Sequence, residues 1–358
     1  MLSLLHKDSN MASHISDHQQ ERNNSSSILD IHSDIFSNHI LTRLDGSSLV
    51  STGSASSELN KFCKDENLWK NICNSTWPST DDRRLLDIIA AFPAGYRSFF
   101  SDCYPSLDHS AKPKVQLVDR EIEGRQSLSK ISELISAVDI RYDNNLIYSK
   151  VQSTETSTDW FLSSPFRVDL LDPKETIPTP VPVLEGNKDL FRSQLDQNLT
   201  LCWILVDPVS QRAANLSTLT PVSVERHWLD EDIHAHYVTS LPGLFAGESS
   251  EVVQCSILVV CGGTGGDLQI KEVSLLVQDM DGKSLNGRES VAILHEAMEG
   301  QRKRKGKREE ERERYQELME MRREMGERKQ RRERMMDMVC MLTGVSIFMA
   351  FCGFLWLR

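Results

Sequence analysis

The glycine-rich run Cys261–Gly266 is the first candidate for chemistry in this chain of 358 residues, because clustered glycines can hold a phosphate. A phosphate-binding loop needs a following Gly-Lys-Ser/Thr and a helix that opens behind it, and neither follows this run. Gly282-Lys283-Ser284 has that tripeptide but lacks the upstream glycine loop. We therefore interpret the first run as a flexible connection between strands and the second as a polar turn.

Histidines offer a second candidate chemistry, metal binding. His234 and His236 lie on one face of an expected strand, because side chains alternate along a strand, and His227 is close in sequence. Metal binding needs a third ligand, which the sequence does not place, so no metal site is assigned. Asp279-Met280-Asp281-Gly282 matches the start of a calcium loop, but the later ligand positions do not fit an EF-hand.

The eight cysteines are scattered and form no CxxC pair, which indicates neither a zinc module nor a disulfide framework. No Ser-His-Asp arrangement can be argued from sequence order alone. We therefore assign no catalytic residue and no cofactor. The cysteines are Cys63, Cys73, Cys103, Cys202, Cys255, Cys261, Cys340 and Cys352.

The stretch Met338–Leu357 contains 20 residues and no charge. A helix of about 20 apolar residues matches the hydrocarbon core of a bilayer, and the hydroxyls of Thr343 and Ser346 can bond back to the helix backbone. A buried core helix is the alternative, but such helices usually show a polar face. We expect a transmembrane helix with nothing of substance beyond it, because only Arg358 follows.

The segment before this run is basic. Residues 301–334 hold 15 Lys/Arg against 9 Asp/Glu, a net charge of +6, so the rest of the −11 chain carries −17. A basic flank stays on the cytosolic side, which predicts a cytosolic or nucleoplasmic body tethered at its C-terminal end. Arg302–Lys305 also fits a nuclear import signal. The acidic body argues against nucleic acid as the main partner.

The N-terminal part divides into a polar tail and a helical region. We expect residues 1–27 to be disordered. Residues 28–80 contain three short amphipathic helix patterns, over 35–44, over Leu49–Phe62 and around Leu68-Trp69. Such short helices cannot bury a sufficient core alone, which predicts that they need a partner.

This region resembles an F-box, the segment of about forty residues that docks onto a Skp-type adaptor of cullin–RING ubiquitin ligases. Ile40-Leu41-Thr42-Arg43-Leu44 is similar to the family's I-L-x-R-L, and Leu68-Trp69 to its terminal L-W. Leu49 matches the leucine that opens the second helix, and Ser56 the serine of V-S-x-x-W.

The resemblance has three departures. His32-Ser33 stands in place of the usual Leu-Pro, Ala55 in place of the valine and Leu59 in place of the tryptophan. The resemblance implies a non-catalytic receptor subunit that binds a Skp-type adaptor and a cullin. The side chains that it implies for adaptor binding are Ile35, Phe36, Ile40, Leu41, Leu44, Leu49, Phe62, Leu68 and Trp69.

The likeness extends over nearly everything from residue 28 to residue 299. In this region the chain is similar to a small plant F-box family that includes the cytokinin-induced F-box protein. Several members of that family also end in an apolar tail. The shared runs are SFFSDCYP (98–105), ELISAVDIRY (133–142), SPFRVDLLDPK (164–174), RAANLS (212–217), PVSVERHWL (221–229) and QDMDGKSLNGRES (278–290).

The predicted fold class is α+β. After a connector (81–111) with one helix, Arg84–Phe92, residues 112–299 indicate a mainly antiparallel β-sandwich. Ala137–Tyr142 and Leu146–Val151 flank a turn signal and predict a hairpin. Further strands are expected at 158–171, 199–206, 232–240, 251–261 and 267–279, a closing helix at 286–299, a charged basic helix at 300–337 and the transmembrane helix at 338–357.

We expect Glu/Arg pairs such as Glu309/Arg312 and Glu320/Arg323 to support the charged helix. The spacing of an expected buried Trp160, the RVDLL run and LCWILV faintly resembles the phloem-lectin-type domain of other plant F-box proteins. The sequence thus favours a membrane-tethered substrate receptor of a ubiquitin ligase. A carbohydrate-binding membrane module with a vestigial F-box and a non-ligase membrane adaptor are the alternatives.

Overall fold

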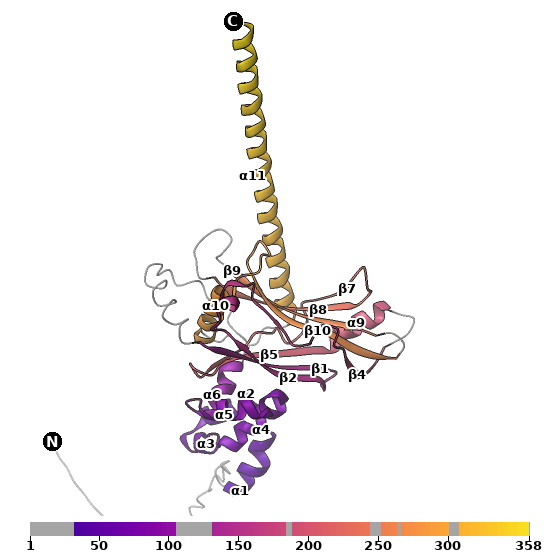
Figure 1. The fold of residues 1–358 in the computed structure, drawn as a ribbon. Coiled ribbons are helices and arrows are strands. Elements are labelled where there is room, and N and C mark those ends of the chain that lie inside the picture. Colours follow the sequence, from indigo (N-terminus) through magenta and orange to yellow (C-terminus); the bar gives the residue numbers. More distant parts are fainter. Residues whose placement is uncertain are drawn as a thin grey trace, which may run out of the picture.

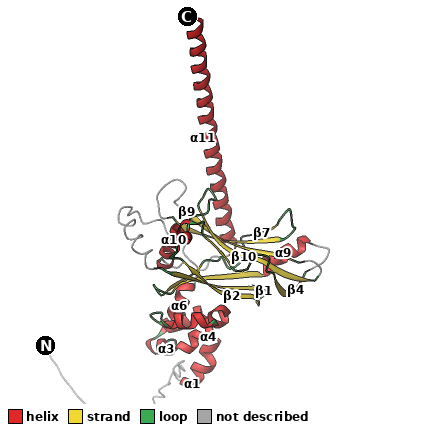
Figure 2. Cartoon of the chain, in the orientation of Figure 1, coloured by secondary structure: helices red, strands yellow, loops and turns green. Residues whose placement is uncertain are grey.

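A computed structural model describes residues 32–104, 131–183, 188–243, 252–263, 266–300 and 308–357. Helices come first, two antiparallel sheets follow, and one long helix ends the chain (Figures 1 and 2), which confirms the predicted α+β class. The expected tail 1–27 and the import-like run Arg302–Lys305 lie outside the described residues.

The N-terminal helices differ from the predicted pattern at two places. The expected single helix Leu49–Phe62 is wrong, because Ser56 is extended (φ −154°, ψ 158°) and its hydroxyl caps a new helix by accepting from the Leu59 N–H at 3.1 Å. The expected connector holds two helices instead of one. The elements are α1 (Ser33–Ile35), η2 (Phe36–Ile40), η3 (Leu41–Arg43), α2 (Gly46–Ala55), α3 (Ser57–Phe62), α4 (Glu66–Thr76), η4 (Pro78–Asp81), α5 (Arg83–Ala90) and α6 (Gly95–Cys103).

Two sheets form the β region. The first has the strand order β2-β1-β5-β6, and the second has the order β3-β10-β9-β8-β7, with β4 also paired to β10. The strands are β1 (Glu133–Tyr142), β2 (Asn145–Glu155), β3 (Arg167–Asp169), β4 (Ile177–Pro182), β5 (Leu199–Asp207), β6 (Arg212–Asn215), β7 (Ser223–Arg226), β8 (Ile233–Pro242), β9 (Val252–Gly262) and β10 (Asp267–Gln278).

The predicted hairpin is confirmed: β1 and β2 pair antiparallel, and Asp143 and Asn144 in the turn have positive φ angles of 49° and 63°. The strand expected at 158–171 is wrong, because α8 (Asp159–Ser163) occupies its first part and only β3 is extended. Trp160 lies on α8 and is 78% exposed, so the expectation that it is buried is also wrong.

The first sheet is buried on both faces. Alternate residues along each strand face opposite sides, so each strand can contribute side chains to two different cores. On β1, Leu134 and Val138 join the core between the two sheets, whereas Ile135 and Ala137 join the core of the N-terminal helices. Trp203 on β5 is fully buried in the core between the sheets. The helices therefore pack on the outer face of this sheet, which is the lower side in Figure 1.

Three helices complete the fold: α9 (Lys188–Asn198), α10 (Gly287–Glu299) and α11 (Arg308–Trp356). The predicted closing helix is confirmed as α10, which Asn286 caps by accepting from the Glu289 N–H at 2.9 Å. The expected charged helix and the apolar run form one helix, α11. The ion pairs of these two arginines differ from the expected ones, since Arg312 contacts Asp196 and Arg323 pairs with Glu327 at 3.5 Å.

Candidate adaptor-binding site

The N-terminal helices form a hydrophobic core with one another and with the first sheet of the same chain. Trp69 on α4 packs against Phe100 on α6, with ring centroids 5.3 Å apart, and Trp77 packs against Phe99 at 6.1 Å. The same buried cluster continues into the outer face of the first sheet through Ile204 on β5. The first sheet of the same chain therefore supplies part of the core that these short helices cannot form alone.

Polar contacts reinforce this junction. The buried carboxylate of Asp139 on β1 accepts from the Ser79 N–H at 3.0 Å, the Ser79 hydroxyl at 2.6 Å and the Ser149 hydroxyl at 2.7 Å. Burial raises the pKa of Asp139, although the hydrogen bonds from both serines oppose that shift. Asp102 on α6 lies 3.3 Å from the Arg212 guanidinium on β6. The helices are thus fixed to the sheet by charge as well as by apolar packing.

Close backbone contacts position α2. A Cβ added to Gly46 would lie 2.1 Å from the Phe100 ring, and one added to Gly53 would lie 3.2 Å from the Cys63 Cβ. Asp45 caps the helix by accepting from the Ser48 N–H at 2.7 Å, and this bond lowers the pKa of Asp45. Glycine at positions 46 and 53 therefore allows α2 to approach α6 and Cys63 closely.

The structure divides the nine predicted adaptor-binding side chains into two groups. Trp69 is 1% exposed and its indole N–H donates to the Cys63 carbonyl at 2.7 Å, so in this structure the ring belongs to the core of the chain. The buried members are Phe36, Leu41, Leu49, Leu68 and Trp69.

The other four predicted side chains reach the surface. Ile35 is 52% exposed, whereas Ile40, Leu44 and Phe62 are half-buried. Val50 on α2 is 54% exposed. The sequence did not single it out, because the motif match fell on its neighbour Leu49. A helix turns about 100° per residue, so a side chain beside a buried one can face solvent. These side chains form exposed or half-buried apolar surface on the N-terminal helices.

Among the other candidates, the glycine run begins in the last two residues of β9 and precedes β10, with residues 264 and 265 outside the described part, and Gly282 occupies a turn with φ +79°. Both positions fit the predicted connections. His234 and His236 are partly exposed on β8. His227 lies beside Asp230, which the sequence did not single out as a possible third metal ligand because Asp230 comes from the turn rather than from a strand. The apolar part of α11 is long and apolar enough to cross a membrane, and none of it is buried against the rest of the molecule.

Three curated proteins of Arabidopsis thaliana are similar to this chain over most of its length. F-box protein At3g44326 is 45% identical over 310 residues, covering 84% of this chain and 82% of the relative. F-box protein At2g27310 is 38% identical over 351 residues, covering 94% and 98%, and Probable F-box protein At2g36090 is 42% identical over 294 residues, covering 82% of each.

No protein-family model matches the chain, and no solved structure matches it. The three relatives align over more than four-fifths of both chains, so the similarity includes the β region and not the short helices alone. The helices with the I-L-x-R-L motif, the sheet on which they pack and these relatives together lead to one conclusion: the chain belongs to a family of plant F-box proteins.

Proposed function

We propose that this protein is a non-catalytic substrate receptor of a Skp–cullin–F-box ubiquitin ligase. The observation that supports this proposal is the apolar surface on the F-box helices. It is formed by the exposed Ile35 and Val50 and by the half-buried Ile40, Leu44 and Phe62. Apolar side chains at a surface contribute to binding when a partner covers them. The adaptor would cover this surface, and the sandwich would hold the target near the transferring enzyme, so that ubiquitin transfer gains from proximity.

We further propose that α11 tethers the receptor to a membrane with the body on the cytosolic side. The support is the fully exposed apolar end of α11 and the basic residues that precede it. In this reading the basic segment orients the helix and is not required for nuclear import. The grouping with the cytokinin-induced F-box protein is part of the same proposal and rests on the shared sequence runs.

Co-purification with a Skp-type adaptor and a cullin tests the ligase role. The paired change Ile35→Asp with Val50→Asp places charges on exposed positions, so it should leave the helical core folded and abolish adaptor binding. Val209→Asp is the matched control, because Val209 is equally exposed at 54% but follows β5 on the sandwich. The ligase role is contradicted if the wild-type protein fails to bind the adaptor under conditions where a standard F-box protein binds it. Retained adaptor binding by the doubly charged variant would instead exclude this surface.

A further inference from the structure

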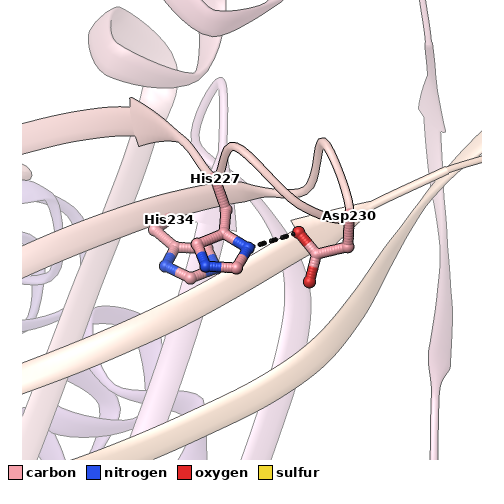
Figure 3. Close-up of side chains that lie close together, drawn as sticks. All are labelled: His227, Asp230 and His234. Carbon is pink, nitrogen blue, oxygen red and sulfur yellow. Dashed lines mark hydrogen bonds and ion pairs between the residues drawn. The ribbon is translucent and has the colours of Figure 1, made fainter.

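Three potential metal ligands meet at the turn between β7 and β8. His227 follows β7, His234 is the second residue of β8, and Asp230 lies in the turn between them (Figure 3). One nitrogen of each imidazole and a carboxylate oxygen all lie within 4.8 Å of one another. The group lies away from the adaptor-binding helices and is unrelated to the proposed function.

The turn that brings these groups together is fixed by its own hydrogen bonds. The His227 N–H donates to the Asp232 carbonyl at 2.8 Å, and the Asp232 N–H donates to Asp230 Oδ1 at 3.2 Å. Glu231 takes a positive φ of 62°, which closes the turn. His234 is held by the pairing of β8 with β7 and β9. Two of the three ligands are therefore positioned by backbone contacts and not only by their side chains.

The distances suit a small transition-metal ion. His227 Nδ1 lies 2.8 Å from Asp230 Oδ1, and two ligand atoms bound tetrahedrally to Zn²⁺ at about 2.0–2.1 Å lie about 3.3 Å apart. The His227 and His234 rings stack with centroids 4.9 Å apart, so one ring must turn for both nitrogens to face one ion. His227 lies outside β7 with a third of its side chain exposed, which leaves it room to turn.

The surrounding charges favour a cation. Glu225 is the cross-strand partner of His234 and adds a further carboxylate on β7. The nearby ammonium of Lys271 is bound at 2.7 Å to Asp232 and not to Asp230. Two imidazoles and one carboxylate form a ligand set that zinc and related ions accept, with a fourth position left for water or another ligand.

We propose that His227, Asp230 and His234 bind a divalent transition-metal ion of the Zn²⁺ type. The ion replaces the hydrogen bond between His227 and Asp230 and joins the turn to β8. Trp228 and Leu229 lie in the same turn and are 83% and 70% exposed. Metal binding therefore fixes the position of two strongly exposed apolar side chains of the sandwich, so the shape of this surface depends on whether the metal is bound.

Calorimetric titration of the full-length protein in detergent with Zn²⁺ tests the site. We expect one site per chain that His227→Ala with His234→Ala removes, weakening that binding step by more than about tenfold. Asp230→Asn keeps the size of the side chain and should also weaken it. His14→Ala with His18→Ala is the matched control, since these histidines belong to the N-terminal tail and should leave the step unchanged.

Fluorescence gives a second measurement that a mere change in folding would not imitate. The Trp228 and His227 rings lie 6.1 Å apart, so bound Cu²⁺ should quench Trp228. Quenching at one equivalent of Cu²⁺ should therefore fall in Trp228→Phe and in the doubly substituted histidine variant. The proposal is overturned if Zn²⁺ binds the histidine variant and the wild type equally, or if Cu²⁺ quenching is the same with and without Trp228.

Discussion

At the scale of single residues, Asp139 joins the F-box helices to the first sheet. Its side chain is 3% exposed and receives hydrogen bonds from Ser79 of η4 and from Ser149 of β2. A carboxylate in such a place loses hydration, which disfavours its charged form, and the two serines recover only part of that loss. The contact is therefore sensitive to pH.

We predict that Asp139→Asn gains stability relative to wild type as the pH rises. The folded-state pKa of Asp139 is raised, so its ionisation costs the native state free energy once the pH exceeds the ordinary carboxyl value of about 3.9. Asparagine stays neutral and avoids that cost. Urea unfolding of both proteins between pH 4 and 7 (about the range over which carboxyl groups titrate) should show this divergence.

Two comparisons separate the ionisation of Asp139 from its hydrogen bonding. Asp139→Ala also removes the charge but leaves the Ser79 donors unpaired, so it should be less stable than Asp139→Asn by about 1–3 kcal/mol. A difference between Asp139→Asn and wild type that stays constant with pH, or falls, would contradict the assigned direction of the shift.

At the scale of elements, α11 is docked to the second sheet before its apolar part begins. Leu318 is 3% exposed and packs with Val222 and Val238, near Met280. Arg308 and Arg312 both contact Asp196 on α9. The start of α11 is thus held by one buried leucine and by a shared carboxylate, whereas its later turns carry exposed apolar side chains.

We predict that Leu318→Asp releases the start of α11 from the sheet. A charge in this small apolar cluster loses hydration without gaining a partner, and even truncation of a buried leucine costs about 2–5 kcal/mol. Hydrogen exchange in residues 308–325 should rise. Met319→Asp is the matched control, because Met319 is 40% exposed. Equal protection in Leu318→Asp and wild type would show that the cluster does not hold the helix.

Strand positions were predictable where apolar runs end in turn residues, as at Asp143 and Asn144, but helix breaks were not. Ser56 interrupts the expected second helix because its hydroxyl caps α3, and a serine within a helical pattern gives no sign of which role it takes. Trp160 was expected to be buried from spacing alone, although burial depends on which partner a side chain meets.

The candidate site was predictable as a segment but not as a surface. The I-L-x-R-L run marked the helices, but Leu41 and Leu49 face a core that includes Phe100 and Ile204, far away in sequence. Only the packed structure separates those buried residues from the exposed Ile35 and Val50.

At the scale of the whole molecule, we predict that the full-length protein resists carbonate extraction and that a chain ending at Arg334 does not. The reason is that α11 exposes its apolar end, which water solvates poorly. Protease added to intact microsomes should digest the body. Glycosylation at Asn74, Asn198 or Asn215 would place the body in the lumen and contradict the proposed orientation.

The two outer faces of the sandwich carry different elements, the F-box helices on the first sheet and α11 on the second (Figure 1). The last described contact of α11 with the body is that of Lys329 with Asp281 at 3.3 Å, nine residues before Met338. Nine helical residues rise about 13 Å. In a chain held by α11, lipid therefore approaches the second sheet, while the F-box side stays sterically open to bulky partners. Encounters with membrane-bound targets then occur by lateral diffusion in two dimensions.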